Sequence, residues 1–174
     1  MNTANKLTMV RVALIPVFLT VLYIGFPGGN YAAMAVFIIA GMTDIADGYI
    51  ARSRSQVTDF GKFIDPLADK VLVVSAMLWF VEEGVIPAWV ALIVIIREFM
   101  VTALRLNAVG NGRVIAAAIS GKVKTVVTMV CLTAMFLELQ QWMIYVCIAA
   151  ITVTTLISGA EYFIKNKDVI KIDR

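Results

Sequence analysis

The distribution of apolar residues is the strongest constraint on the fold of this chain. Apolar side chains make up 61% of its 174 residues, against about 45–50% in a soluble domain. Because backbone groups find no partners in lipid, an apolar stretch of about 20 residues crosses a membrane as a helix. We therefore predict an all-α integral membrane protein: one domain over residues 1–174, with six transmembrane helices. The six stretches are residues 7–25, 31–51, 61–81, 87–106, 118–138 and 142–163.

The positions of the basic residues predict how these helices are oriented. Lys and Arg gather at the N-terminus, around the second and fourth breaks between stretches, and in the polar tail at 165–174. The other breaks lack them, and two carry Glu82, Glu83 and Glu138. The positive-inside rule then places both termini and the tail in the cytoplasm. We expect a multi-pass protein of the cell membrane. Its basic face should contact the cytoplasm and the anionic lipid headgroups, and we expect no nucleic acid among its partners.

Four aspartates interrupt the apolar sequence: Asp44, Asp47, Asp65 and Asp69. A carboxylate at membrane depth costs about 2.5–3.5 kcal/mol, so four of them need partners. The first two are three residues apart and the last two are four apart, so each pair shares a helix face. The midpoint of positions 44 and 69 and the midpoint of positions 47 and 65 both fall at about residue 56, in a polar break. A helical hairpin about that break brings the two pairs level with each other.

Carboxylate clusters of this kind suit hard cations such as Mg²⁺, Mn²⁺ or Ca²⁺. Two divalent ions would nearly neutralise four carboxylates and would suit phosphoryl displacement. The chain has no histidine, which removes the usual imidazole base and ligand. Two alternatives stay open: the aspartates pair with Arg52, Lys62 and Lys70, or they belong to a cation-coupled transporter.

The spacing of these residues resembles the signature of the CDP-alcohol phosphotransferases, D-x2-D-G-x2-A-R-x8-G-x3-D-x3-D. The resemblance implies that the four aspartates bind Mg²⁺ or Mn²⁺, with two ions expected, and that Asp69 is also the catalytic base. It further implies a homodimer with its active site facing the cytoplasm. The matching residues are Asp44, Asp47, Gly48, Ala51, Arg52, Gly61, Asp65 and Asp69.

Shorter segments narrow the expected substrates within this family. Four segments resemble the branch that joins CDP-diacylglycerol to sn-glycerol 3-phosphate and releases CMP: residues 5–11, 65–70, 97–98 with 103–105, and 121–125. An enzyme of the same fold that makes cardiolipin from phosphatidylglycerol, or one with another acceptor, is the close alternative. The positions that the resemblance assigns to binding CDP-diacylglycerol are Asn5, Thr8, Gly48, Ala51, Arg52 and Thr58.

An acceptor with a phosphate dianion requires cations, and four lie within predicted helices: Arg97, Arg105, Lys122 and Lys124. Arginine suits bidentate contact with a phosphate. We predict that these four bind the glycerol phosphate, with Arg11 a weaker fifth candidate and Glu98 orienting one arginine. The alternative is that such long side chains only extend toward the membrane surface.

Overall fold

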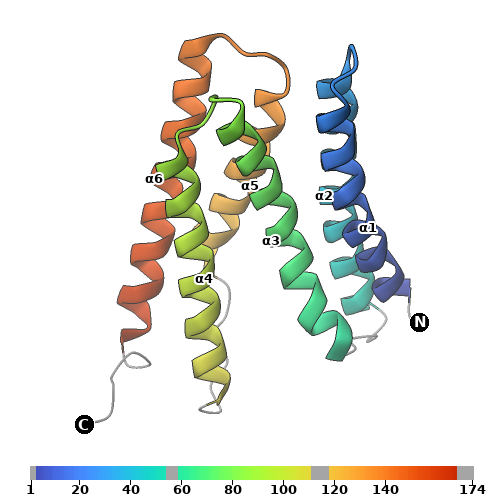
Figure 1. Cartoon of the computed structure of the whole chain (residues 1–174). Helices are drawn as coiled ribbons and strands as arrows, with labels where there is room; N and C mark the ends of the chain where they lie inside the picture. Colours follow the sequence, from blue (N-terminus) through green and yellow to red (C-terminus); the bar gives the residue numbers. More distant parts are fainter. Residues whose placement is uncertain (1–2, 54–58, 111–117, 168–174) are drawn as a thin grey trace. The chain divides into compact units, whose positions relative to one another are not determined.

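The computed structural model describes residues 3–53, 59–110 and 118–167, and these form six α-helices (Figure 1). The predicted all-α class is therefore confirmed over these ranges, with a helix in each apolar stretch. α5 ends three residues before the predicted position because Phe136 and Leu137 donate to carbonyls three residues back, which closes the last turn. The helices are α1 (Thr3–Ile24), α2 (Gly29–Ser53), α3 (Asp59–Glu82), α4 (Ala88–Gly110), α5 (Ile119–Met135) and α6 (Gln141–Lys165).

Two of the described helices are long and apolar enough to cross a membrane, α1 over Leu7–Ile24 and α6 over Gln141–Lys165. α5 has 17 residues, and α4 carries Arg97, Glu98 and Arg105 within its length. The two apolar helices support association with a membrane. The count of six spans and the cytoplasmic termini stay predictions.

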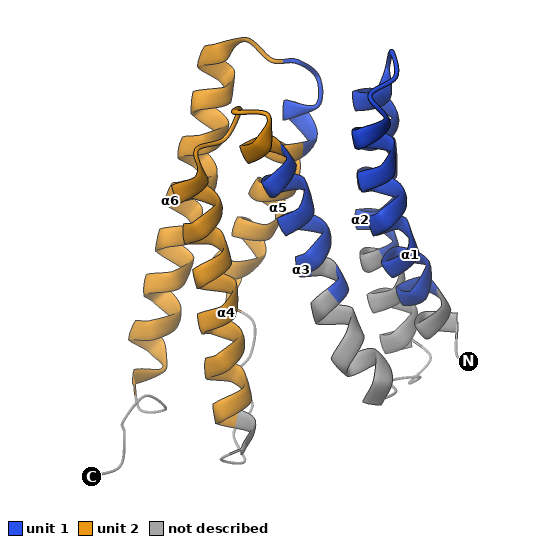
Figure 2. Cartoon of the chain, in the orientation of Figure 1, with its two compact units in different colours: residues 1–79, 133–138 blue, residues 80–132, 139–174 orange. Residues whose placement is uncertain are grey.

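The chain divides into two compact units (Figure 2). Unit 1 consists of Met1–Trp79 with Thr133–Glu138, and unit 2 consists of Phe80–Leu132 with Leu139–Arg174. The single domain expected over residues 1–174 stays a prediction, and each unit is described by itself.

Unit 1 is built on the pairing of α1 with α2. The connection between them is tight because Gly25 and Gly28 adopt φ values of 65° and 84°, which favour glycine. Three buried rings form the core: Phe18 lies 5.9 Å from Phe37 and 6.0 Å from Phe136 between ring centroids. This aromatic cluster holds α1 and α2 together.

Unit 2 is built on the pairing of α4 with α6. Its apolar core includes Val90 and Val94 of α4, Leu132 of α5 and Ile151 of α6, all at most 1% exposed. Four buried polar side chains lie toward the end of the unit where α4 and α6 finish and α5 begins: Lys124, Thr128, Thr155 and Ser158. That polar end contains the contacts of Arg97, Glu98 and Lys124.

Candidate active site

Asp44 and Asp47 both lie within α2, as predicted. The buried face of α2 runs through Ala33, Phe37 and Ala40, each 0% exposed. Because a helix repeats every 3.6 residues, positions 44 and 47, four and seven residues after Ala40, continue that face. By spacing alone, the first aspartate pair therefore falls in the same helical register as Ala40.

Asp65 and Asp69 lie within α3, also as predicted. Ala68, Leu72 and Ala76 are buried along this helix, and positions 65 and 69 fall on the same face by helical spacing. The donor set is entirely carboxylate oxygen, which fits Mg²⁺ or Mn²⁺. The side chains of all four aspartates lie outside those the structure describes, so the carboxylate cluster itself stays a prediction.

The N-terminal half of α1 contributes two buried polar residues, Thr8 at 1% and Arg11 at 0% exposure. They begin the face that Ile15 and Phe18 continue toward the core. Nε of Arg11 donates a hydrogen bond of 3.4 Å to Oγ1 of Thr43, the residue just before Asp44. Arg11 is thus a buried cation within unit 1, beside the helix that carries the first aspartate pair.

The remaining positions predicted to bind CDP-diacylglycerol fall where little is described. Asn5 lies in α1, and Gly48, Ala51 and Arg52 lie in α2, with their surroundings outside the described part of the structure. Thr58 lies outside the described residues altogether. Their roles stay predictions.

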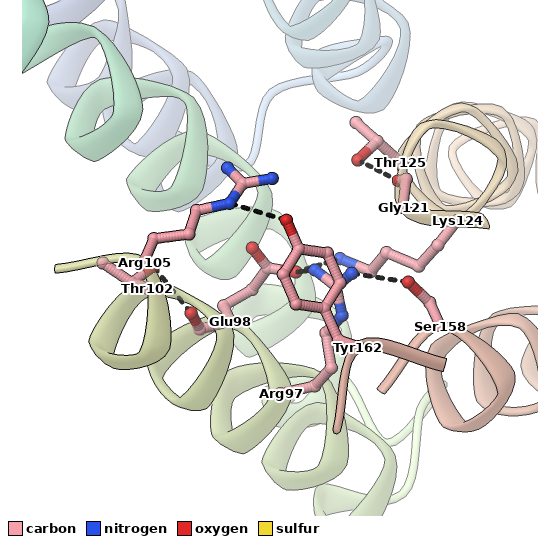
Figure 3. A network of polar contacts seen from close by, with 9 residues as sticks. All are labelled: Arg97, Glu98, Thr102, Arg105, Gly121, Lys124, Thr125, Ser158 and Tyr162. Carbon is pink, nitrogen blue, oxygen red and sulfur yellow. Dashed lines mark hydrogen bonds and ion pairs between the residues drawn. The ribbon is translucent and has the colours of Figure 1, made fainter. Parts of the chain in front are cut away.

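In unit 2, Glu98 of α4 links two of the predicted phosphate-binding cations (Figure 3). Its Oε1 lies 2.9 Å from Nη1 of Arg97 and 2.8 Å from Nζ of Lys124 on α5. The three side chains are 18%, 11% and 4% exposed respectively. A carboxylate shared between buried Lys124 and partly buried Arg97 compensates the desolvation that would otherwise oppose placing the two cations there.

Arg97 is held on a second side by α5 and α6. Its Nη2 donates to Oγ of Ser158 at 2.5 Å. A Cβ atom built on Gly121 would lie 3.3 Å from that Nη2, and one built on Gly159 would lie 3.5 Å from Cγ of the same arginine. The two glycines therefore make the space in which the Arg97 side chain lies.

Arg105 contacts a different partner, Tyr162 of α6. Its Nε donates a 2.7 Å hydrogen bond to Oη of Tyr162, and its Cζ lies 5.3 Å from the centroid of that ring. Cζ of Arg97 lies 5.8 Å from the same centroid. Tyr162, itself 2% exposed, thus contacts both arginines through its ring, an arrangement that favours cations over its π face.

The structure brings together three of the four cations predicted on α4 and α5. Arg97 and Lys124 meet at Glu98, as expected of a carboxylate that orients an arginine, and Arg105 joins Arg97 through Tyr162. Lys122 is exposed, because residues two apart on a helix face different directions. Its role in binding glycerol phosphate stays a prediction.

Ser158 and Tyr162 are two members of this network that the sequence analysis missed. With Thr155 they are spaced three and four residues apart along α6, and all three are at most 2% exposed. A polar stripe in an otherwise apolar helix indicates a face turned toward protein rather than lipid. That stripe was the available signal, but only the folded structure identifies which cations it meets.

Comparison with known proteins identifies the family of this chain. Residues 1–156 match the family described as CDP-alcohol phosphatidyltransferase. The chain is 38% identical to the CDP-diacylglycerol–glycerol-3-phosphate 3-phosphatidyltransferase of Bacillus subtilis, over 98% of this chain and 97% of the relative. It is also 38% identical to the protein of the same name from Escherichia coli K12, over 90% of this chain and 88% of the relative. The chain belongs to the CDP-alcohol phosphatidyltransferase family.

Proposed function

We propose that this protein transfers the phosphatidyl group of CDP-diacylglycerol to sn-glycerol 3-phosphate, giving phosphatidylglycerophosphate and CMP. The observation that carries the proposal is the complete aspartate signature, whose two halves lie on two consecutive helices, α2 and α3. The names of the relatives from Bacillus subtilis and Escherichia coli supply the donor and the acceptor.

The reaction is a displacement at phosphorus. A hydroxyl oxygen of glycerol 3-phosphate forms a bond to the β-phosphorus of CDP-diacylglycerol, and the bond from that phosphorus to the CMP oxygen breaks. CMP leaves with the electron pair, and Asp69 takes the proton of the attacking hydroxyl. Because a carboxylate is a weak base toward an alcohol, the proton moves late, and positioning and charge compensation account for most of the acceleration.

The metal ligands in this proposal are Asp44, Asp47, Asp65 and Asp69. Bound Mg²⁺ or Mn²⁺, with two ions expected, supplies positive charge against the pyrophosphate. The alternative, in which the aspartates pair only with nearby basic residues, predicts activity that does not depend on divalent metal.

The acceptor's phosphate is proposed to bind the cationic end of unit 2. There Arg97, Lys124 and Arg105 lie in one contact network with Glu98, so among the described residues of this network cations outnumber carboxylates. An excess of positive charge in a partly buried place attracts a phosphate dianion. Arg11, buried in unit 1, remains the weaker candidate for the same ligand.

We further propose a homodimer in the cell membrane whose chains each cross six times, with both termini in the cytoplasm. The basic residues at the helix ends support this orientation. The network of unit 2 lies toward the end of α6 that leads into the polar tail, which is the end assigned to the cytoplasm. An active site on that side receives water-soluble substrates while the diacylglycerol tails remain in lipid.

Release of labelled CMP from CDP-diacylglycerol tests the proposed function. Purified protein in detergent should release CMP when Mg²⁺ or Mn²⁺ and sn-glycerol 3-phosphate are both present, and chelation should stop the release. Parallel reactions with phosphatidylglycerol and inositol phosphate identify the acceptor. A preference for either of these two alcohols would contradict the proposed acceptor. If no alcohol acceptor supported the release of CMP, a cation-coupled transporter would become the favoured function.

Replacing Arg105 by Ala should raise the KM for sn-glycerol 3-phosphate by about 10–100-fold, the equivalent of losing a charged hydrogen bond to phosphate. The KM for CDP-diacylglycerol should not change. Lys165→Ala is the matched control, because that cation lies exposed on α6 beside Glu161. An unchanged acceptor KM in Arg105→Ala would exclude Arg105 from the pocket.

A further inference from the structure

We propose that Tyr162 is a positioning residue that orients Arg105 toward the phosphate of the acceptor, an inference that rests on the proposed function. Tyr162 lies on α6 beyond residue 156, where the family match ends. Its contacts within unit 2 indicate its role.

Two contacts constrain the guanidinium of Arg105. The hydroxyl of Tyr162 accepts from Nε at 2.7 Å, and the ring lies below Cζ at 5.3 Å. Arg105 is exposed, whereas Tyr162 is 2% exposed and fixed in the interior of unit 2. A long exposed arginine otherwise samples many rotamers, and ordering it in advance removes that entropic cost from ligand binding.

The same contacts leave the terminal nitrogens of Arg105 available. In Figure 3 both lie on the far side of the hydrogen bond from the Tyr162 ring. Arg97 differs, because its Nη1 donates to Glu98 and its Nη2 donates to Ser158. Among the described residues no hydrogen bond occupies either Nη atom of Arg105, so this arginine presents the two-pronged edge that binds phosphate oxygens.

This division assigns different tasks to the two arginines. Arg97 is enclosed with Glu98 and Lys124, contributing charge from a buried position. Arg105 makes the direct contact with phosphate, and Tyr162 sets its direction. A purely structural role for Tyr162 is the competing explanation, and it predicts loss of stability without a selective effect on the acceptor.

Tyr162→Phe separates these explanations, because it keeps the ring and removes only the hydroxyl that accepts from Arg105. We expect the KM for sn-glycerol 3-phosphate to rise about tenfold, as for a hydrogen bond to a charged group. The turnover number and the KM for CDP-diacylglycerol should stay as in the wild type. Tyr145→Phe, an exposed tyrosine on the same helix, should change none of these constants. KM does not depend on the fraction of enzyme that is folded, so partial misfolding does not obscure the result.

A double-mutant cycle then shows whether Tyr162 acts through Arg105. In an Arg105→Ala background, adding Tyr162→Phe should leave the acceptor KM unchanged, because the group being positioned is already absent. An equal rise in both backgrounds, or no rise in the single variant of an enzyme that uses sn-glycerol 3-phosphate, overturns the inference and leaves the proposed function intact. A wild-type protein that does not use sn-glycerol 3-phosphate overturns the proposed function itself.

Discussion

Asp69→Asn should lower the rate of CMP release by at least about 10²–10⁴-fold, the contribution of a general base. Asparagine has nearly the same shape but cannot accept the proton of the attacking hydroxyl. It also offers a neutral oxygen where the proposed metal site needs a charged one, so the loss should lie at the upper end of that range. Single-turnover release of labelled CMP at saturating sn-glycerol 3-phosphate measures the effect on chemistry directly.

The matched control for this prediction is Glu83→Gln. It makes the same change from carboxylate to amide at an exposed position just beyond the end of α3. It should leave CMP release as in the wild type. Elution of Asp69→Asn at the wild-type volume in size-exclusion chromatography establishes that the variant is folded. Activity near the wild-type level in a folded Asp69→Asn protein would remove Asp69 from the role of base.

Glu98→Gln should reduce the free energy of unfolding by about 3–5 kcal/mol, the cost of removing one partner from a buried ion pair. The carboxylate lies within 2.9 Å of two cationic nitrogens, on Arg97 and Lys124, in a largely buried cluster. An amide leaves both cations buried without a counter-charge. Denaturant-induced unfolding in mild detergent, followed through the signal of the helices, measures the difference.

Glu161→Gln provides the control for the loss of Glu98. Glu161 also pairs with a cation, Lys165, but the lysine side chain is 65% exposed. Pairs of this kind contribute at most about 1 kcal/mol, so this variant should unfold almost as the wild type does. If Glu98→Gln lost no more stability than Glu161→Gln, the cluster around Glu98 would not hold α4 and α5 together.

Sequence and structure contribute unequally to the two parts of the candidate site. The aspartate pairs are recognisable from the chain alone, because their spacing of three and four residues already specifies a helix face. The structure confirms a helix over each pair, α2 and α3, while the aspartate side chains lie outside those it describes. The cations of unit 2 were also predicted from the sequence as candidates for phosphate binding. Sequence spacing, however, did not distinguish Lys122 from Lys124. Their different exposure follows from where α5 packs, which no local pattern specifies.

The sequence by itself determined the helical class, the positions of six helices and the family, because apolar runs and carboxylate spacing are local properties of the chain. Only the tertiary structure decided which partners the cations contact. It placed Glu98 between Arg97 and Lys124, and it put Tyr162 against Arg105 across 57 positions of sequence. These contacts depend on how α4 and α6 pack against each other. Residues far apart in the sequence bury one another there, so the sequence near any single residue does not predict its partners.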